Sequence, residues 1–256
     1  MKSIKSILIL LLLTVLFCCK NEKESTDIVE KEDKLIIDEP VKVIPITHGT
    51  LILETENDVI YIDPTGGLKA FNNQKDPTLV LITDIHGDHL SKSTLESLDL
   101  NNATIVGPKA VTDKIPSTTC KTIVTINNGD TYMHEAVKIE AIPMYNLRNE
   151  ALEYHTKGRG NGYVLNIEEE RIYISGDTED IPEMRSLKNI DKAFICMNLP
   201  WTMTVESAAS AVLEFKPKTV YPYHYRGSEG MSDLNKFKKI VSKDNSSINI
   251  EFLDWY

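Results

Sequence analysis

Short apolar runs, rich in β-branched residues and bounded by turn-forming residues, recur along most of the chain. Runs of this kind are typical of β-strands. The predicted strands cover residues 41–46, 50–53, 59–62, 79–83, 103–106, 121–125, 137–142, 162–167, 171–175, 193–197, 219–223 and 248–253. Helices, of which the fourth has the clearest 3.6-residue spacing, are predicted over residues 91–97, 108–113, 182–187, 204–215 and 232–242.

The tripeptide Ile-Tyr-Ile occurs twice, at residues 60–62 and 172–174, each time where the pattern predicts the second strand of a hairpin. An acidic residue lies near the end of each of these strands, Asp63 in the first and Asp177 in the second. The similarity indicates two related β-rich halves, with a site where their loops meet.

The residues that end the predicted strand at 79–83 and follow it carry the strongest chemical signal. The segment Thr83-Asp84-Ile85-His86-Gly87-Asp88-His89 places two imidazoles and two carboxylates within six residues. Core packing gains nothing from four ionisable groups at the end of a strand, whereas nitrogen and oxygen donors at this density can surround a divalent cation. The segment therefore predicts a metal site and a metal-dependent enzyme.

Two further donors follow predicted strands later in the chain. Asp177 lies in Ser-Gly-Asp-Thr after the 171–175 strand, where Gly176 permits a sharp turn, and His224 directly follows the 219–223 strand. Alone, the first motif is more often a turn and the second an isolated histidine. Their order after the dense motif favours a shared metal site, because a strand end holds a ligand rigidly.

In this order the motifs resemble those of the metallo-β-lactamase superfamily. Residues 83–89 are similar to its signature loop, His-x-His-x-Asp-His, while Asp177 matches its bridging aspartate and His224 its last metal-binding histidine. Asp63-Pro64 is similar to its early Asp-Pro, and the motif order is most similar to the branch of L-ascorbate-6-phosphate lactonase-like proteins. The resemblance spans about residues 41–253 and implies an α+β fold, a four-layer αβ/βα sandwich with metals in a cleft at one edge.

The resemblance implies a set of carboxylate and imidazole metal ligands: Asp84, His86, Asp88, His89, Asp177 and His224. The last two residues of the signature loop and His224 would form one metal position. His86 and Asp84 would form the other, and Asp177 would bridge both. Asp88 or Asp177 would also orient the attacking hydroxide, which makes these two carboxylates the catalytic candidates.

Two departures from the superfamily pattern affect the second metal position. Position 84 is Asp where the family has His, and the family's mid-chain histidine has no clear match. Asn146 lies near the expected place and His155 a short loop later, so both are candidates for a metal or substrate contact. His48, after the first strand, is a further candidate for the cleft, with a hydrogen-bonded loop histidine as the equal alternative.

The expected cofactor is a divalent metal, one or two ions per chain, with one firm site and a second that is weaker or differently populated. Zinc is the first expectation. A carboxylate at position 84 makes the second site harder and more anionic, which favours Mn or Fe there. In the Gly-rich segment after His155, Lys157 and Arg159 could receive an anionic substrate group, although a plain mobile loop is the favoured interpretation.

The implied reaction is hydrolysis of an ester, lactone or phosphodiester bond in a small-molecule substrate by a metal-bound hydroxide, since a coordinating cation lowers the pKa of water to about 7. The sequence has neither a Gly-x-Ser-x-Gly elbow nor a Gly-x-x-x-x-Gly-Lys loop, which argues against serine hydrolases and nucleoside triphosphatases. The alternative is a catalytically inactive, envelope-attached metal-binding or scaffold protein with the same fold.

Residues 1–19 are typical of a secretory signal peptide. Lys2 and Lys5 precede an apolar run at residues 7–17 that is too short to span a bilayer. The Leu-Phe-Cys-Cys that ends this segment resembles a bacterial lipobox, with Cys19 as the lipidated residue. An ordinary secretory signal is the alternative.

Residues 20–39 are mostly charged or polar and predict a flexible tether, whereas residues 40–256 predict one hydrolase domain. The net charge is −10, and cleavage before Cys19 would remove Lys2 and Lys5 to give −12. Such an acidic chain argues against a nucleic-acid partner. Together these features predict a protein of the bacterial cell envelope, lipid-anchored to the membrane or periplasmic.

Overall fold

Two β-sheets form the centre of the structure, a computed structural model that describes residues 40–256. The predicted signal peptide, Cys19 and the tether lie outside the described residues. The first sheet begins as an antiparallel meander and continues with parallel strands. Its strands, in spatial and sequence order, are β1 (Lys42–Thr47), β2 (Thr50–Glu54), β3 (Val59–Ile62), β4 (Leu79–Leu81), β5 (Thr104–Gly107) and β6 (Thr122–Thr125).

The second sheet has the strand order β15-β12-β11-β10-β9-β8-β7. Its strands are β7 (Thr131–His134), β8 (Val137–Met144), β9 (Gly160–Ile167), β10 (Glu170–Ile174), β11 (Lys192–Ile195), β12 (Thr219–Pro222) and β15 (Asn249–Ile250). It too joins an antiparallel meander, β7 to β10, to parallel strands. The two halves predicted from the repeated Ile-Tyr-Ile are therefore the two sheets.

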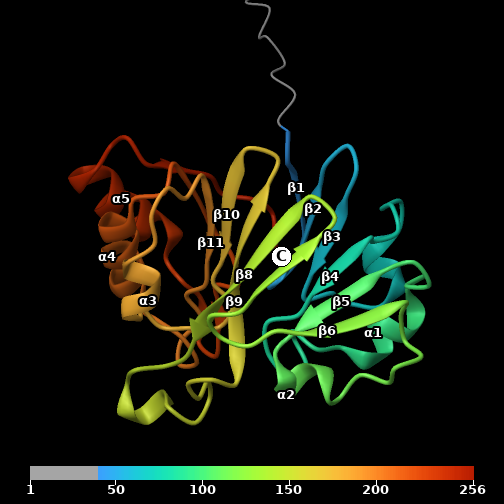
Figure 1. Cartoon of the computed structure of the whole chain (residues 1–256). Coiled ribbons are helices and arrows are strands. Elements are labelled where there is room, and N and C mark those ends of the chain that lie inside the picture. Colours follow the sequence, from blue (N-terminus) through green and yellow to red (C-terminus); the bar gives the residue numbers. More distant parts are fainter. Residues whose placement is uncertain (1–39) are drawn as a thin grey trace, which may run out of the picture. The chain divides into compact units, whose positions relative to one another are not determined.

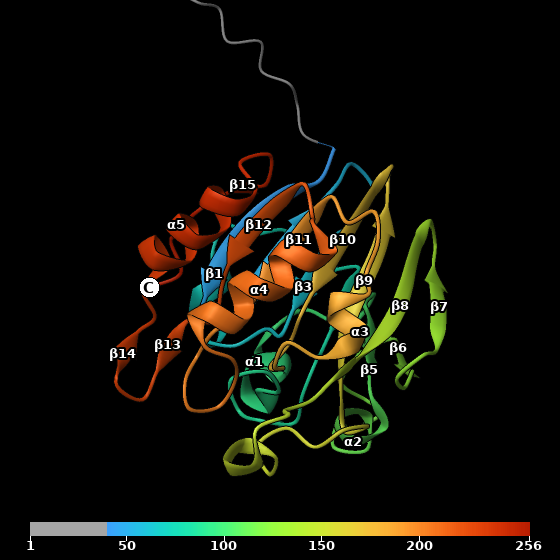
Figure 2. The same ribbon diagram turned by 90° about the vertical axis from the view of Figure 1, so that its left-hand side faces the viewer.

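Helices flank the pair of sheets on both outer sides (Figure 1; Figure 2). On the side of the first sheet lie α1 (Lys92–Ser97) and α2 (Lys109–Thr112). On the side of the second sheet lie α3 (Pro182–Arg185), α4 (Val205–Phe215) and α5 (Leu234–Asp244). Short 3-10 turns, η1 (Leu68–Phe71) and η2 (Asn149–Ala151), and a ribbon of β13 (Arg226–Gly227) and β14 (Gly230–Met231) complete the chain.

Alternate residues of β2 show how the layers are packed. Leu51 and Leu53 belong to the large core cluster that contains residues of both sheets, whereas Ile52 belongs to a second cluster shared with α1 and α2. Side chains of a strand point alternately to its two faces, so the first sheet buries both of its faces. The arrangement helix–sheet–sheet–helix confirms the predicted α+β four-layer sandwich.

Several elements differ from the prediction. β4 ends at Leu81 rather than at residue 83, because the Thr83 backbone N–H donates to a side chain, Asp63, instead of a strand. β15 keeps only two residues of the predicted 248–253 strand. β7 was not predicted, because its side chains are mostly polar and its residues are exposed or half-buried at the edge of the sheet.

None of the helices within residues 40–256 has both the length and the apolar character needed to cross a membrane.

Candidate metal centre

The loop that follows β4 brings the predicted signature residues to the end of the first sheet. Its residue Thr83 donates from the backbone N–H to Asp63 Oδ1 at 2.7 Å and from the hydroxyl to Asp63 Oδ2 at 2.6 Å. Asp63 Oδ2 is also 2.8 Å from His89 Nδ1. Because Asp63 holds one ring nitrogen of His89, the other nitrogen, Nε2, is directed toward Asp177.

Asp177 lies among three histidines, just after β10. Its Oδ2 is 3.5 Å from His89 Nε2 and 3.4 Å from His155 Nε2. Its Oδ1 is 3.5 Å from His224 Nε2. The chain turns here at Gly176, whose φ of +60° suits glycine and whose Cβ, if present, would collide with neighbouring side chains. The turn predicted from the Ser-Gly-Asp-Thr motif is therefore present.

A first group of donors lies on one side of Asp177. Asp88 Oδ2 is 3.4 Å from His224 Nε2 and also 3.4 Å from His48 Nε2. The rings of His48 and His224 are 3.8 Å apart between centroids, and His48 Nδ1 is 2.7 Å from the Tyr256 hydroxyl. The structure thus places His48, whose role the sequence left open, within this group.

A second group of donors consists of Asp84, His86 and His155. His86 Nδ1 is 2.6 Å from Asp84 Oδ2, and His155 Nε2 is 3.9 Å from the same oxygen. Ligand atoms of the three residues all lie within 4.8 Å of one another. Since His155 Nε2 also approaches Asp177, this histidine links the two groups.

Asn146, the other mid-chain candidate, stabilises the loop that carries His155 through hydrogen bonds. Its side-chain amide donates to the carbonyls of Ala151 at 2.9 Å and Trp201 at 2.6 Å. Its backbone N–H donates to the His155 carbonyl at 2.9 Å. Of the two candidates, the structure therefore places His155 beside Asp177, while Asn146 holds the backbone around it.

Several buried polar atoms of the centre have no hydrogen-bond partner within residues 40–256: His89 Nε2, His155 Nε2, Asp177 Oδ1 and His224 Nε2. Such atoms are rare in folded proteins, because each costs desolvation free energy. Ligand atoms of His89, Asp177 and His224 lie within 4.8 Å of one another. Imidazole nitrogens and a carboxylate oxygen at this spacing suit a divalent cation, so the residues present fit a metal.

Local charges for two carboxylates and burial for one histidine keep three of the donors in their metal-binding forms. Burial alone raises the pKa of Asp177, but the facing His224 and His89 outweigh it and lower that pKa below its usual value. Burial also raises the pKa of Asp88, and the facing His224 and His48 lower it further than burial raises it. Burial lowers the pKa of His155. At neutral pH both carboxylates are ionised and His155 is neutral, as metal binding requires.

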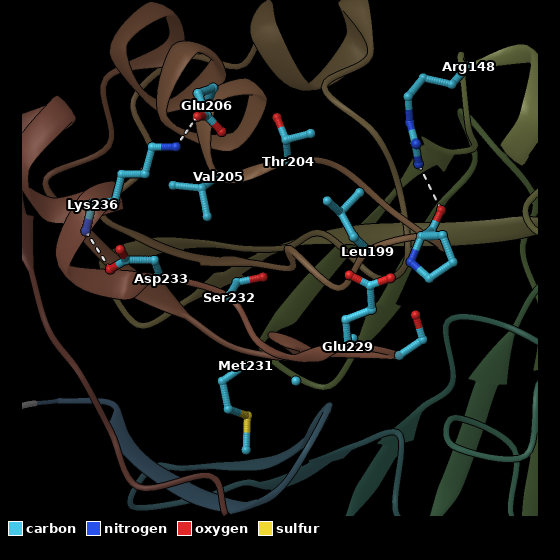
Figure 3. A pocket seen from close by; sticks show the side chains of 14 residues that line it. Arg148, Leu199, Thr204, Val205, Glu206, Glu229, Met231, Ser232, Asp233 and Lys236 are labelled. Atoms are coloured by element: carbon cyan, nitrogen blue, oxygen red, sulfur yellow. Dashed lines mark hydrogen bonds and ion pairs between the residues drawn. The ribbon is translucent and has the colours of Figure 1, made fainter.

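A cavity of about 260 Å³ opens onto these donors. Its lining residues are His86, Asp88, Tyr154, His155, Asp177, Asn198 and Trp201. A larger hollow of about 510 Å³ is lined by the beginnings of α4 and α5 and by residues of the β13–β14 ribbon (Figure 3). At its border Arg148 donates to the Pro200 carbonyl at 2.8 Å. No member of the donor groups lines this hollow, so the smaller cavity is the candidate substrate site.

The two cations that the sequence offered as anion receivers are both paired with carboxylates. Lys157 Nζ is 3.0 Å from Glu183, and the Arg159 guanidinium is 3.1 Å from Asp84. The Asp84–Arg159 pair was missed because 75 positions separate its members. No local pattern in the sequence pairs residues at that separation.

Comparisons with known proteins identify the family. The family described as Beta-lactamase superfamily domain matches residues 43–224. A UPF0173 metal-dependent hydrolase from Pyrococcus horikoshii is 31% identical over 213 residues, which cover 78% of this chain and 92% of the relative. One from Methanopyrus kandleri is 26% identical, over 84% of this chain and 97% of the relative.

Solved structures agree with this assignment. A protein from Parabacteroides distasonis assigned as a metal-dependent hydrolase has a TM-score of 0.75 and 35% identity, over 84% of this chain and 94% of that one. A metallo hydrolase from Ignicoccus hospitalis shares the fold, with a TM-score of 0.70 and 21% identity over 84% and 95% of the two chains. The closer resemblance to the L-ascorbate-6-phosphate lactonase-like branch stays a prediction. The chain belongs to the metallo-β-lactamase superfamily and is a metal-dependent hydrolase of that fold.

Proposed function

We propose that the cavity at the metal centre hydrolyses a carboxylic ester or lactone of a small, uncharged molecule. The observation that carries this proposal is the lining of the cavity. Two carboxylates, two imidazoles, an amide and two aromatic rings line it, and no lysine or arginine of residues 40–256 does. Proteins that recognise phosphate groups usually present arginine or lysine to them. The lining therefore favours an acyl substrate over a phosphodiester.

The proposed ligand set keeps every metal ligand predicted from the sequence and adds His155. The first metal position takes Asp88, His89 and His224. The second takes Asp84, His86 and His155. Asp177 lies between the two positions, since its two oxygens face histidines of both. The short distances among these donors and their unpartnered buried atoms support the assignment.

A divalent metal in this set supplies Lewis-acid activation of water and of the substrate carbonyl. The Asp88 side chain is 45% exposed, and Asp88 and Asp177 both line the cavity. Their carboxylates would accept hydrogen bonds from the attacking water. These bonds orient the water toward the carbonyl carbon. Tyr154 and Trp201 line the same cavity and would pack against the apolar part of the substrate.

We propose zinc as the metal of the first position, because imidazole nitrogens and carboxylate oxygens are among the ligands that zinc takes in proteins. At the second position Asp84 replaces an imidazole by a carboxylate, which makes Mn or Fe the alternative there. The chain would then hold one or two metals, with the second more weakly bound or differently populated.

We propose that the protein is a lipoprotein of the bacterial cell envelope, anchored to the membrane through lipidated Cys19. The support comes from the sequence alone: two lysines, a short apolar run and the Leu-Phe-Cys-Cys segment in that order. A lipid on Cys19 attaches a protein to a membrane without spanning it. The substrate would then be a small molecule of the envelope or the surroundings.

Hydrolysis of p-nitrophenyl acetate, a simple γ-lactone and bis-p-nitrophenyl phosphate by the Zn-, Mn- or Fe-loaded protein tests the proposed reaction. We expect turnover of the ester or the lactone, reduced about 100-fold or more in D88N because the attacking water loses an ionised acceptor. D113N removes an exposed carboxylate that binds Lys109 and serves as the control. Turnover of the phosphodiester alone would contradict the proposal, and no turnover of any substrate would favour the scaffold alternative.

A further inference from the structure

Arg159 lies against Asp84 of the second donor group. Its Nε is 3.1 Å from Asp84 Oδ1, and its Nη2 is 3.1 Å from Asp84 Oδ2. The Asp84 side chain is fully buried, and that of Arg159 is 19% exposed. A guanidinium that binds a carboxylate at two points fixes the plane of the carboxylate as well as its position. Arg159 therefore determines how Asp84 is oriented.

The same guanidinium holds a second loop of the centre. Arg159 Nη2 also donates to the carbonyl of Tyr154, the residue before His155. The backbone near Arg159 is anchored in turn, because Asn161 donates to the Thr83 carbonyl at 3.0 Å. One arginine therefore connects the loop after β4, which carries Asp84, to the loop before β9, which carries His155.

Charge is the second reason to treat Asp84 and Arg159 as one unit. Asp84 brings a negative charge to a position where the superfamily signature has a neutral imidazole. The adjacent guanidinium brings a positive charge, so the pair as a whole is neutral. Asp84 Oδ2 faces His86 Nδ1 at 2.6 Å, so this oxygen is directed into the donor group.

We propose that Arg159 is a positioning residue of the second metal site, which fixes Asp84 as a ligand through Oδ2 and anchors the loop that carries His155. Asp84 and Arg159 together then replace one histidine of the superfamily signature. The inference rests on the proposed function, because it requires the metal centre. Receipt of an anionic substrate group by Arg159 is not favoured, since Nε and Nη2 are both bound to protein oxygens.

Calorimetric titration of the purified, metal-free protein with Zn²⁺ or Mn²⁺ alone, together with metal counts per chain, tests this role. R159M is expected to weaken the second metal about 10–100-fold and to leave the first unchanged, because it removes the group that orients a ligand. R159K keeps the charge but not the two-point contact, so it is expected to recover only part of the affinity. R171M removes an arginine that binds Glu140 at 3.2 Å and should change neither metal.

A double-variant cycle separates this role from a general structural one. D84H alone leaves an unpaired guanidinium beside the second metal, and it is expected to weaken that metal to a similar extent. D84H/R159M restores the neutral imidazole of the superfamily signature without the unpaired cation. We therefore expect it to bind the second metal more tightly than either single variant, a non-additive result that mere loss of packing does not produce.

Unchanged affinity for the second metal in R159M, or additive losses in D84H/R159M, would overturn the positioning role and leave the metal centre standing. A second metal that binds only after R159M is introduced would also overturn it, because the guanidinium would then stand in for that metal. If the parent protein binds no metal, both this inference and the proposed function are wrong.

Discussion

Asp63 is fully buried after β3 and uses both carboxylate oxygens on the loop that carries the ligands. Through His89 Nδ1 it also fixes the ring whose Nε2 faces Asp177. Carboxylates that hold a metal-binding imidazole in this way set its orientation and raise its basicity. We therefore expect Asp63 to act as a positioning residue for the first metal, without touching the metal itself.

Replacement of Asp63 by Asn is expected to weaken the first metal about 10–100-fold, since the amide keeps the size of the side chain but loses the charge that holds His89. Calorimetric titration with Zn²⁺ measures this affinity. D58N is the matched control, because Asp58 is also buried and accepts a hydrogen bond, from Thr78 at 3.1 Å, outside the centre. Equal Zn²⁺ affinities for D63N and the parent protein would contradict the positioning role.

Most of the candidate metal ligands that the sequence could identify directly follow a strand. The Thr83–His89 loop, Asp177 and His224 each come after an apolar run, so their place at a sheet end followed from the pattern. His155 follows no strand, which is why the sequence left it open beside Asn146. Its place beside Asp177 depends on loop contacts to Asn146 and Trp201 that only the folded chain shows.

At the scale of elements, the turn between β10 and α3 decides where Asp177 stands. Gly176 has a φ of +60°, and an added Cβ would lie 2.5 Å from Met144 Sδ and 3.1 Å from Thr83 Cβ. Both neighbours are buried. The turn therefore has neither the backbone conformation nor the space that a larger residue needs. It holds Asp177, which follows a strand of the second sheet, against the loop after β4 of the first sheet.

G176A is expected to lower the free energy of unfolding by about 1 kcal/mol for the left-handed backbone and by about 1–3 kcal/mol more for crowding. Urea denaturation of the metal-free protein measures the sum. G129A isolates the backbone cost, since Gly129 has a φ of +89° in a turn closed by the Asp130 N–H and the Asn127 carbonyl, and nothing lies within 4 Å of an added Cβ. If G176A cost no more than G129A, close packing at this turn would not be what requires glycine.

The elements themselves were mostly predictable, because apolar β-branched runs in this chain are buried strands. The exceptions are strands that are held by backbone hydrogen bonds to a neighbouring strand and not by the burial of apolar side chains. β7 has mostly polar side chains and is held by its antiparallel ladder with β8. β13 and β14 pair only through Arg226–Met231 and Gly227–Gly230, too short a ribbon to leave a pattern in the sequence.

At the scale of the whole molecule, the candidate metal centre lies where the loops of the two sheets meet. Asp63 and the loop after β4 come from the first sheet, whereas Asp177 and His224 follow strands of the second. Ligands from both halves converge on one cavity, as the repeated Ile-Tyr-Ile suggested. The fold class followed from the resemblance of the ordered metal-binding motifs to those of the superfamily, and the apolar runs alone indicated only two β-rich halves.

The proposed envelope location predicts that C19S will shift the protein from the membrane fraction to the soluble fraction of the bacterium that produces it. The reason is that the acyl chains that anchor a lipoprotein are attached to this cysteine. C18S is the matched control, because it changes the neighbouring thiol and leaves Cys19 in place. A C19S protein that stays with the membrane would contradict the lipid anchor.

The central claim, that Asp88, His89, His224 and Asp177 form a metal centre, is tested most directly by counting metals per chain with elemental mass spectrometry. The protein is purified without chelators beside a double variant, H89A/H224A. We predict about one to two metals in the parent protein and a clear loss in the variant, since two imidazole ligands are gone. Near-zero metal in the parent protein, even after reconstitution with Zn, Mn or Fe, would contradict the account.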